Sequence, residues 1–228
     1  RALSISTSGR PGPVVLAVPD DVQFTDIRAG QVSPVKRPVM EPAVKSVAKV
    51  AELLSTSKKP LALLGGTGWS QAACNNFAKF ASAWDLPVGT TFRRNDLIDF
   101  GHSSYIGSFG PGPHPNLVAQ AKECDLLLLI GARLGEIETS GYTHLCEADE
   151  DRTLIHAAAL ADEFGEMLQP DLAIVTDVAP FSAALAELPV VAGLAYAGQR
   201  QALRNSLLAY NKPVDFGDKL NPANAVQA

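Results

Sequence analysis

The sequence alternates short, almost wholly apolar runs with longer stretches in which apolar residues recur at helical spacing. The apolar runs, which we expect to be strands, cover residues 60–64, 86–91, 125–130, 153–156 and 172–176. Helical periodicity covers residues 41–54, 70–84, 116–124, 180–188 and 199–210. Strands whose side chains are apolar on both faces of a sheet are found where helices pack on both faces. The alternation therefore predicts an α/β fold, a parallel sheet with helices on both faces.

The turn after the first of these strands is the strongest local feature. Crossovers between parallel strands are right-handed, so the turns that follow the strands open at one edge of the sheet. Gly65, Gly66 and Thr67 form such a turn before a helix, and glycines let backbone N–H groups approach an anion such as a pyrophosphate. The dinucleotide fingerprint has a third glycine where Gln71 stands. A tight turn without a ligand therefore remains the alternative.

A second segment leaves a strand at the same edge. Gly131, Ala132 and Arg133 follow the apolar run 125–130. The planar guanidinium group of Arg133 could bind a phosphate through two parallel hydrogen bonds. The alternative for this arginine is an ion pair at the surface or at an interface.

The glycine-rich stretch 90–113 also leaves the end of a strand. Its length and glycine content are typical of a functional or domain-contacting loop. Thr90 begins it, and Arg93 could meet an anion. The alternative is that one of the two adjacent arginines pairs with a nearby aspartate.

Composition and missing motifs exclude several function classes. The net charge is −5 with no basic face, which argues against a nucleic-acid partner, and the longest apolar run, 126–130, is too short to cross a membrane. The chain has no nucleophile elbow, no HExxH motif and no close carboxylate pair, so we predict neither catalytic nor metal-ligating residues in it. His156 is expected to be a buried, hydrogen-bonded imidazole. Three cysteines without a CxxC pattern indicate a reduced, cytoplasmic protein.

The beginning of the chain does not fit a self-contained domain. The β-branched run 14–18 reads as a buried strand, yet no strand precedes it to pair with. Residues 22–39 are polar and punctuated by proline, which is typical of a linker. We therefore expect the run 14–18 to be the last strand of a preceding domain.

Six short motifs occur in an order that is similar to that of a known family. They lie at residues 9–22, 63–66, 87–91, 131–134, 170–188 and 220–223. Their order resembles that of the thiamine-diphosphate-dependent enzymes of the acetolactate synthase and benzoylformate decarboxylase type. The resemblance covers nearly the whole chain and implies a Rossmann-like fold, that of the middle domain of such an enzyme.

The resemblance also implies a domain organisation. Residues 1–22 would be the C-terminal end of the pyrimidine-binding domain, and 23–39 a linker. Residues 40–190 would be the middle domain, and 191–228 a linker into the diphosphate-binding domain. The chain would then be an interior piece whose flanking domains are missing, and full-length relatives are homodimers or homotetramers.

In this family thiamine diphosphate and Mg²⁺ support decarboxylation of 2-keto acids, with or without carboligation. The glutamate that activates the cofactor belongs to the first domain. The Gly-Asp-Gly motif that holds Mg²⁺ belongs to the third, and Gly217, Asp218 and Lys219 do not match it. The resemblance therefore implies that these 228 residues alone are inactive.

The middle domain of some relatives holds FAD, and that of others an ADP-type nucleotide or no ligand. The matching positions here, which are our candidate cofactor-binding residues, are Gly65, Gly66, Thr67, Thr90, Arg93, Gly131, Ala132 and Arg133. The chain departs from the flavin pattern, because three alanines (157–159) follow the strand 153–156 where the flavin enzymes have an acid. FAD, another nucleotide and an empty site all stay open. The competing functions are a free-standing NAD-, FAD- or ADP-binding domain and a purely structural module.

Overall fold

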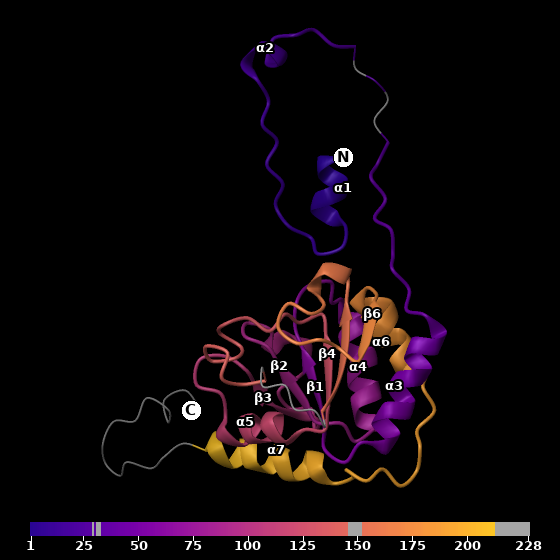
Figure 1. Cartoon of the computed structure of the whole chain (residues 1–228), viewed down its shortest axis with the longest axis vertical. Coiled ribbons are helices and arrows are strands. Elements are labelled where there is room, and N and C mark those ends of the chain that lie inside the picture. The colour runs from indigo at the N-terminus through magenta and orange to yellow at the C-terminus, as the bar shows by residue number, and fades with distance from the viewer. Residues whose placement is uncertain (29, 31–32, 146–151, 213–228) are drawn as a thin grey trace, which may run out of the picture.

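The computed structural model describes residues 1–28, 30, 33–145 and 152–212 (Figure 1). Its centre is one sheet of six parallel strands in the order β3-β2-β1-β4-β5-β6. The strands are β1 (Pro60–Leu64), β2 (Val88–Thr90), β3 (Tyr105–Ser108), β4 (Leu126–Ile130), β5 (Thr153–Ala158) and β6 (Leu172–Val175). The strand order runs outward in both directions from β1 and β4, which confirms the expected Rossmann-like α/β fold.

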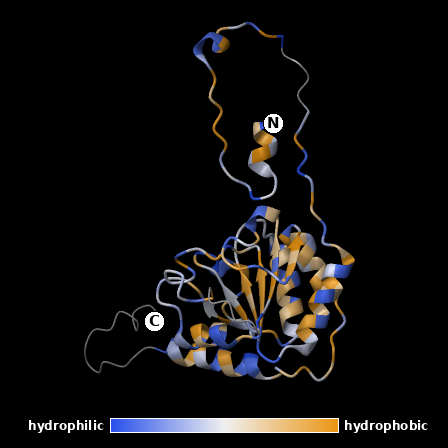
Figure 2. Ribbon diagram, viewed as in Figure 1, coloured by the Kyte–Doolittle hydropathy of each residue, from blue (hydrophilic) through white to orange (hydrophobic). Residues whose placement is uncertain are grey.

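The middle of the sheet is its most apolar part. Every residue of β1 and β4 is buried, and the two strands pair along their full length, from Pro60 beside Leu126 to Leu64 beside Ile130. In Figure 2 much of the sheet is drawn in the orange of hydrophobic residues. Side chains alternate between the two sides of a strand, so the leucine run feeds a core on each face of the sheet.

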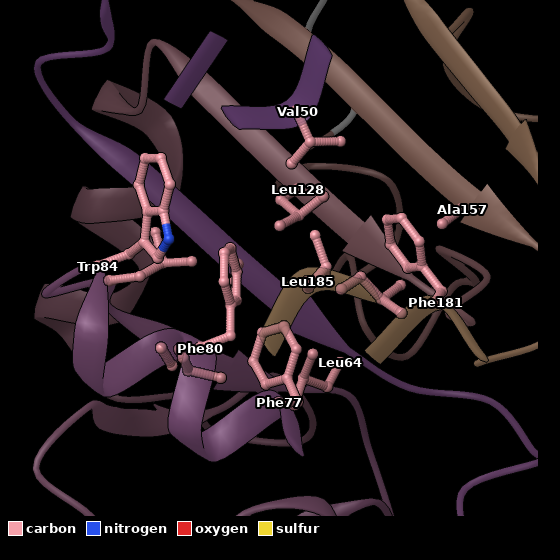
Figure 3. Packing of buried hydrophobic residues seen from close by; sticks show 14 of the residues in the cluster. Val50, Leu64, Phe77, Phe80, Trp84, Leu128, Ala157, Phe181 and Leu185 are labelled. Carbon is pink, nitrogen blue, oxygen red and sulfur yellow. The ribbon is translucent and has the colours of Figure 1, made fainter. Parts of the chain in front are cut away.

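One face carries the larger core. It is covered by α3 (Val44–Thr56), α4 (Gln71–Ala83) and α6 (Val178–Ala186). Aromatic side chains of α4 and α6, among them Phe77, Phe80 and Phe181, pack in one cluster with Leu64 and Leu128 of the sheet (Figure 3). Truncating such a fully buried aromatic side chain typically costs about 3–5 kcal/mol. This face therefore contributes most to holding the layers together.

The other face is covered by α5 (Pro115–Glu123) and by the segments that follow β4 and β5. Leu117 and Ala121 of α5 pack on Leu61 and Leu63 of the sheet. The helix begins with proline in its first turn, where the missing N–H costs nothing. The side chain of His114 caps it by accepting a hydrogen bond from the backbone N–H of Asn116 at 3.1 Å.

The side chain of Ser70 caps α4, because its hydroxyl oxygen accepts a hydrogen bond from the backbone N–H of Ala73 at 3.2 Å. Asp177 stands at the N-cap position of α6, but its side chain makes no cap hydrogen bond. Instead, the Asp177 carboxylate accepts from Arg37 at 2.6 Å and from the backbone N–H of Met40 at 3.1 Å.

The last described helix, α7 (Gln199–Tyr210), runs along the β3 edge of the sheet and contacts both β3 and α5, at the helix position that periodicity predicted. The buried guanidinium group of Arg204 donates to the carbonyl of Tyr105 at 3.1 Å and lies 4.9 Å from the centre of the Phe100 ring. The backbone N–H of Gly198 donates to the carboxylate of Asp85 at 2.7 Å. The edge strand is thus covered by a helix that follows the sheet in sequence.

One expectation about a strand was wrong, and another stays a prediction. The stretch 90–113, which we expected to be a loop, contains β3. Glycines obscure the apolar pattern of a strand here: Gly107 has φ +130°, and the register with β2 shifts at Gly89. Conversely, the run 14–18 forms no strand, and Val15 is 93% exposed. A strand needs a neighbour for its backbone hydrogen bonds, and within the described residues none lies beside this run.

The remaining differences concern ends and short helices. α1 (Ala2–Thr7) and α2 (Asp20–Gln23) precede the domain and were not expected. Helix α3 begins at Val44 rather than at Glu41, because both backbone groups of Met40 are bonded to the end of β6 and the start of α6, which keeps the chain extended there. The segments 217–219 and 220–223 lie outside the described residues.

None of the helices in the described ranges combines the length and the apolar character needed to cross a bilayer.

The connection between α3 and β1 is tied to the start of β4 by one carboxylate. Asp125 accepts hydrogen bonds from the hydroxyl of Ser57 at 2.5 Å and from the backbone N–H groups of Lys58 at 2.7 Å and Lys59 at 2.9 Å. Burial opposes ionisation of this carboxyl group, but the three donors together outweigh it and hold its pKa below the ordinary value. A carboxyl group whose pKa is lowered by folding stabilises the protein above its unfolded-state pKa, and that stability is lost as pH falls through its folded-state pKa.

We expect Asp125→Asn to lower the free energy of unfolding by about 2 kcal/mol at pH 7, because an amide cannot accept all three hydrogen bonds. The difference from wild type should shrink as pH falls below about 4, because the carboxyl group becomes protonated first in the unfolded state and, at lower pH, in the folded state. Urea unfolding followed by circular dichroism at pH 7 and at pH 3 measures both effects. The exposed Asp26→Asn is the control and should change stability by under about 0.5 kcal/mol. An Asp125→Asn effect of equal size at both pH values would contradict the prediction.

Candidate functional site

Two hollows lie at the carboxyl ends of the strands, on either side of the point where the strand order reverses. The first is small, with a volume of about 20 Å³ that leaves room for little more than one water molecule, and lies over the ends of β4, β5 and β6. The second has a volume of about 550 Å³ and lies over the turns after β1, β2 and β4. Arg10, Gly66 and Thr67 line both hollows, so they mark the place where the two meet.

The turns after β1 and β4 touch each other at this place. A Cβ atom on Gly66 would lie 1.7 Å from the carbonyl oxygen of Gly131, and one on Gly65 would lie 2.4 Å from the hydroxyl oxygen of Thr91. Gly66 also has φ +67°, a conformation that side chains disfavour. The glycines that the sequence singled out are therefore required by the close approach of two backbones, whether or not a ligand binds.

A tryptophan closes the turn after β1. The indole N–H of Trp69 donates to the carbonyl of Gly65 at 2.8 Å, and its ring stacks edge-on against Phe77 of α4, with centroids 6.1 Å apart. The backbone N–H of Gly65 is itself used, because it donates to the carbonyl of Ile130 at 3.1 Å. The sequence reasoning missed Trp69, although its place just before a helix was a signal.

Arg133 takes part in an ion pair, which was the alternative to phosphate binding. Its guanidinium group donates to the carboxylate of Glu166 from Nε and Nη2, with Nε 3.0 Å from Oε2. The hydrogen bond to Glu166 raises the pKa of Arg133 and lowers that of Glu166. Both side chains are about half exposed and both line the larger hollow. An exposed pair of this kind is worth at most about 1 kcal/mol, so a bound anion could replace Glu166 at little cost.

Four of the predicted cofactor-binding residues line the hollows, namely Gly66, Thr67, Gly131 and Arg133. The lining residues of the two hollows do not include Gly65, Thr90, Arg93 or Ala132, which lie beside them within the described chain. Their part in ligand binding stays a prediction.

Hydrogen bonds and ring contacts account for three of the residues beside the hollows. Thr90 is buried and donates to the side-chain oxygen of Asn95 at 3.1 Å, and Arg93 stacks on the ring of Phe92, 5.1 Å from its centre. Ala132 uses its carbonyl to accept a hydrogen bond from a histidine of β5. The neighbouring Arg94, rather than Arg93, lines the larger hollow, and its Nε donates to Asp96 at 3.0 Å.

The expectation for His156 is confirmed. The imidazole is 5% exposed, its Nε2–H donates to the carbonyl of Ala132 at 3.1 Å, and its ring packs edge-on against Phe164. Burial lowers the pKa of His156 and outweighs the carbonyl, which favours the charged form. His156 therefore holds the turn after β4 in place as a neutral side chain.

The N-terminal segment and the linker supply residues that the sequence reasoning missed. In Figure 1 the turn after α1 lies against the domain on the side opposite to α7. The side chains of Arg10 and Arg37 line the smaller hollow there. Arg37 donates to Asp177 at 2.6 Å and to the carbonyl of Gly9 at 3.4 Å, so it connects the N-terminal segment to the start of α6. Two carboxylates line the same hollow and balance the two guanidinium groups, since Glu163 pairs with Arg10 and Asp177 with Arg37.

Metal ligands are not grouped in the part of the chain that the structure describes, where no three His, Cys, Asp or Glu side chains come together to hold an ion. The positive groups and the glycine turns instead suit an anionic ligand, such as the diphosphate of a nucleotide. In open α/β sheets ligands bind in the crevice where the strand order reverses, and that crevice is the junction of the two hollows.

Comparison with known proteins identifies the domain. The family described as "Thiamine pyrophosphate enzyme, central domain" matches residues 47–188. The chain is 29% identical to the acetolactate synthase large subunit of Cyanidium caldarium over 186 residues, which are 78% of this chain and 31% of that protein. It is 29% identical to the acetolactate synthase large subunit of Corynebacterium glutamicum over 194 residues, which are 82% of this chain and 30% of that protein.

A relative with another activity is also similar. The chain is 28% identical to the glyoxylate carboligase of Escherichia coli O157:H7 over 180 residues, which are 78% of this chain and 30% of that protein. The matches thus span about 30% of the length of these relatives.

We expect Gly66→Ala to lower the free energy of unfolding by at least about 2 kcal/mol more than Gly112→Ala does. Both residues have positive φ, +67° and +70°, but a Cβ at Gly112 meets no atom within 4 Å, whereas one at Gly66 meets the backbone of Gly131. The control therefore carries the backbone strain without the clash. Thermal and urea unfolding of the two variants measure the difference, and equal losses would show that the turns do not touch.

Proposed function

The chain belongs to the thiamine pyrophosphate enzyme family, and we propose that it is the central domain of a longer enzyme that acts on 2-keto acids by decarboxylation or carboligation. The support is the match to the family's central domain together with the similarity to acetolactate synthases and a glyoxylate carboligase. No similar support exists for a free-standing nucleotide-binding domain.

The reactive cofactor of such an enzyme would be held outside the described residues. Thiamine diphosphate supplies the carbanion chemistry in enzymes that bind it, and a bound Mg²⁺ needs oxygen ligands, chiefly carboxylates. The strand-end hollows offer arginines and glycine turns instead, and the described residues contain no group of three metal-ligating side chains. The site here does not fit thiamine diphosphate with Mg²⁺. We therefore propose that the flanking domains of the same chain hold both.

We propose the domain organisation that the motifs predicted: residues 1–22 and 23–39 as the end of one domain and a linker, 40–190 as the central domain, and 191–228 as a second linker, whose helix α7 packs on β3 of the central domain. The hydrogen bond of Arg37 to Asp177 supports a first linker that is attached to the central domain as well. Assembly as a homodimer or homotetramer and a cytoplasmic location stay predictions.

For the central domain itself we propose a nucleotide-binding role, with an ADP-type ligand or the ADP half of FAD. One observation carries this proposal: two hollows meet at the reversal of strand order, and the junction is lined by Arg10, Gly66 and Thr67. A guanidinium group and the backbone of a glycine turn are suited to a diphosphate, with the nucleoside in the larger hollow beside them. The chain's residues would bind and orient the nucleotide and take no part in bond breaking.

Isothermal titration calorimetry of the chain with ADP should give a dissociation constant in the micromolar range, on the order of 10 μM. Arg10→Gln should weaken ADP binding about tenfold, because it removes a charge-assisted hydrogen bond to the diphosphate. The control is Arg28→Gln, since Arg28 is an exposed residue of the same N-terminal segment and lines neither hollow. Wild-type protein that binds neither ADP nor FAD would point to a purely structural domain.

We also expect no turnover of a 2-keto acid such as pyruvate by these residues alone in the presence of thiamine diphosphate and Mg²⁺. The physical reason is that no three metal-ligating side chains come together among the described residues, so the site does not fit thiamine diphosphate with Mg²⁺. A coupled assay for released CO₂ measures the activity, with a complete acetolactate synthase as positive control. Consumption of pyruvate above the rate without protein would contradict this prediction.

A further inference from the structure

A further hollow lies at the outer edge of the sheet, between the end of β3, the start of α5 and the last turn of α7. Figure 1 shows these three elements side by side at the end of the domain opposite to the N-terminal segment, and each contacts the other two. The hollow has a volume of about 280 Å³. We call it the edge hollow, and the lining residues that matter here are Asn95, Phe100, Tyr105, His114 and Tyr210. It shares no lining residue with either strand-end hollow, so it is a separate candidate site.

Aromatic rings line the edge hollow in two pairs. Phe100 packs edge-on against Tyr105 with ring centroids 5.9 Å apart, and His114 packs edge-on against Tyr210 with centroids 4.6 Å apart. Leu207 of α7 adds an aliphatic side chain to the wall. Aromatic rings favour edge-on or offset contacts with further rings. Because an apolar cavity of about 150 Å³ already holds benzene, the edge hollow has room for one aromatic ring with a substituent.

Two side-chain donors at the edge hollow have no hydrogen-bond acceptor within the described residues. His114 is 8% exposed, and its Nδ1 accepts the cap hydrogen bond from Asn116, so the neutral ring carries its proton on Nε2. The side-chain oxygen of Asn95 accepts from Thr90, which leaves its amide nitrogen as a second donor. A buried donor without an acceptor costs free energy. A ligand with an acceptor group would therefore satisfy His114.

The charges around the edge hollow favour an anionic acceptor. Its lining residues include no acid. The buried guanidinium group of Arg204 lies behind the wall, where it donates to the backbone carbonyls of Tyr105 and Phe100 rather than to a carboxylate. Burial raises the pKa of Tyr105, and the positive charge of Arg204 opposes the rise, so its field reaches the lining. A carboxylate in the hollow would meet donors and positive potential but no like charge among the lining residues.

We propose that the edge hollow binds a small aromatic carboxylate, of which benzoate is the simplest. The ligand ring packs among the four aromatic side chains, and its carboxylate accepts hydrogen bonds from Nε2 of His114 and the side-chain nitrogen of Asn95. Because Leu207 and Tyr210 belong to α7, the ligand also joins this helix to the edge of the sheet. The proposal does not depend on nucleotide binding at the strand-end hollows.

A titration of the chain with benzoate, followed by nuclear magnetic resonance, tests the site. The backbone amide signals of Gly107 and Gly112, which line the edge hollow, report binding. We expect a dissociation constant of about 1 mM or tighter, a value suited to a ligand of this size. Cyclohexanecarboxylate keeps the charge without the aromatic ring, and benzamide keeps the ring without the charge. Each should bind at least about fivefold more weakly than benzoate.

Ligand binding should also stabilise the packing of α7. At about 10 mM benzoate, amide hydrogen exchange in α7 should slow about tenfold, because the ligand binds only while the helix is in place. Exchange in α3, on the opposite face of the sheet, is the internal control and should not change to this extent.

Two variants test the residues that the proposal uses. His114→Ser keeps an acceptor for the cap of α5 but removes the ring and its Nε2–H, so it should weaken benzoate binding at least about tenfold. Tyr210→Ala removes one wall and should weaken it about fivefold. The matched control is Leu208→Ala, since Leu208 lies on the same helix, is 42% exposed and does not line the hollow. It should keep the wild-type constant. Melting temperatures show whether each variant folds.

Several results would overturn the proposal, and two of them need no variant. No change in the amide signals at about 10 mM benzoate excludes the site, and equal affinity for benzoate and benzamide excludes its preference for an anion. Wild-type affinity in folded His114→Ser excludes the role of the histidine. Competition between ADP and benzoate would place benzoate in a strand-end hollow instead. A chain that binds benzoate but not ADP would overturn the nucleotide proposal and leave this one standing.

Discussion

The contact between the turns after β1 and β4 is the constraint on which the site depends. These two strands are neighbours at the centre of the sheet, and the chain leaves them toward opposite faces. Their turns therefore meet at one point, with Gly66 against the carbonyl of Gly131, and diverge on both sides of it. The two hollows are the space that this divergence opens. Any side chain at Gly66 would push the turns apart and change both hollows at once.

Much of the fold could be predicted because its strongest signals are local. The leucine run of β4, the cap at Ser70 and the spacing of apolar residues in α7 each specify an element within a few neighbouring residues. β3 could not be predicted, because Tyr105–Ser108 is a strand only through its pairing with β2 and the cover that α7 provides. The run 14–18 shows the opposite case: its composition suits a strand, but a strand needs a partner, and none lies beside it within the described residues.

The candidate site divides in the same way. Gly66, Thr67, Gly131 and Arg133 directly follow apolar strands, so the rule that ligands bind at the carboxyl ends of strands found them. Arg10, Arg37 and Glu163 come from a segment before the domain, from the linker and from an irregular turn. No sequence pattern predicts that residues from three such separate segments lie close together. They are recognised only when the three-dimensional structure places their charges around one hollow.

Helix α7 has a consequence for where the folding unit ends. The family match stops at residue 188, yet Arg204 of α7 hydrogen-bonds the backbone of β3 and covers this outer strand of the sheet. A recombinant protein trimmed to the matched region would leave the backbone groups of β3 open to strands of other molecules, the usual route to aggregation. The stretch that is recognisable in sequence is thus shorter than the stretch that can remain soluble alone, and cloning boundaries are better set beyond Tyr210.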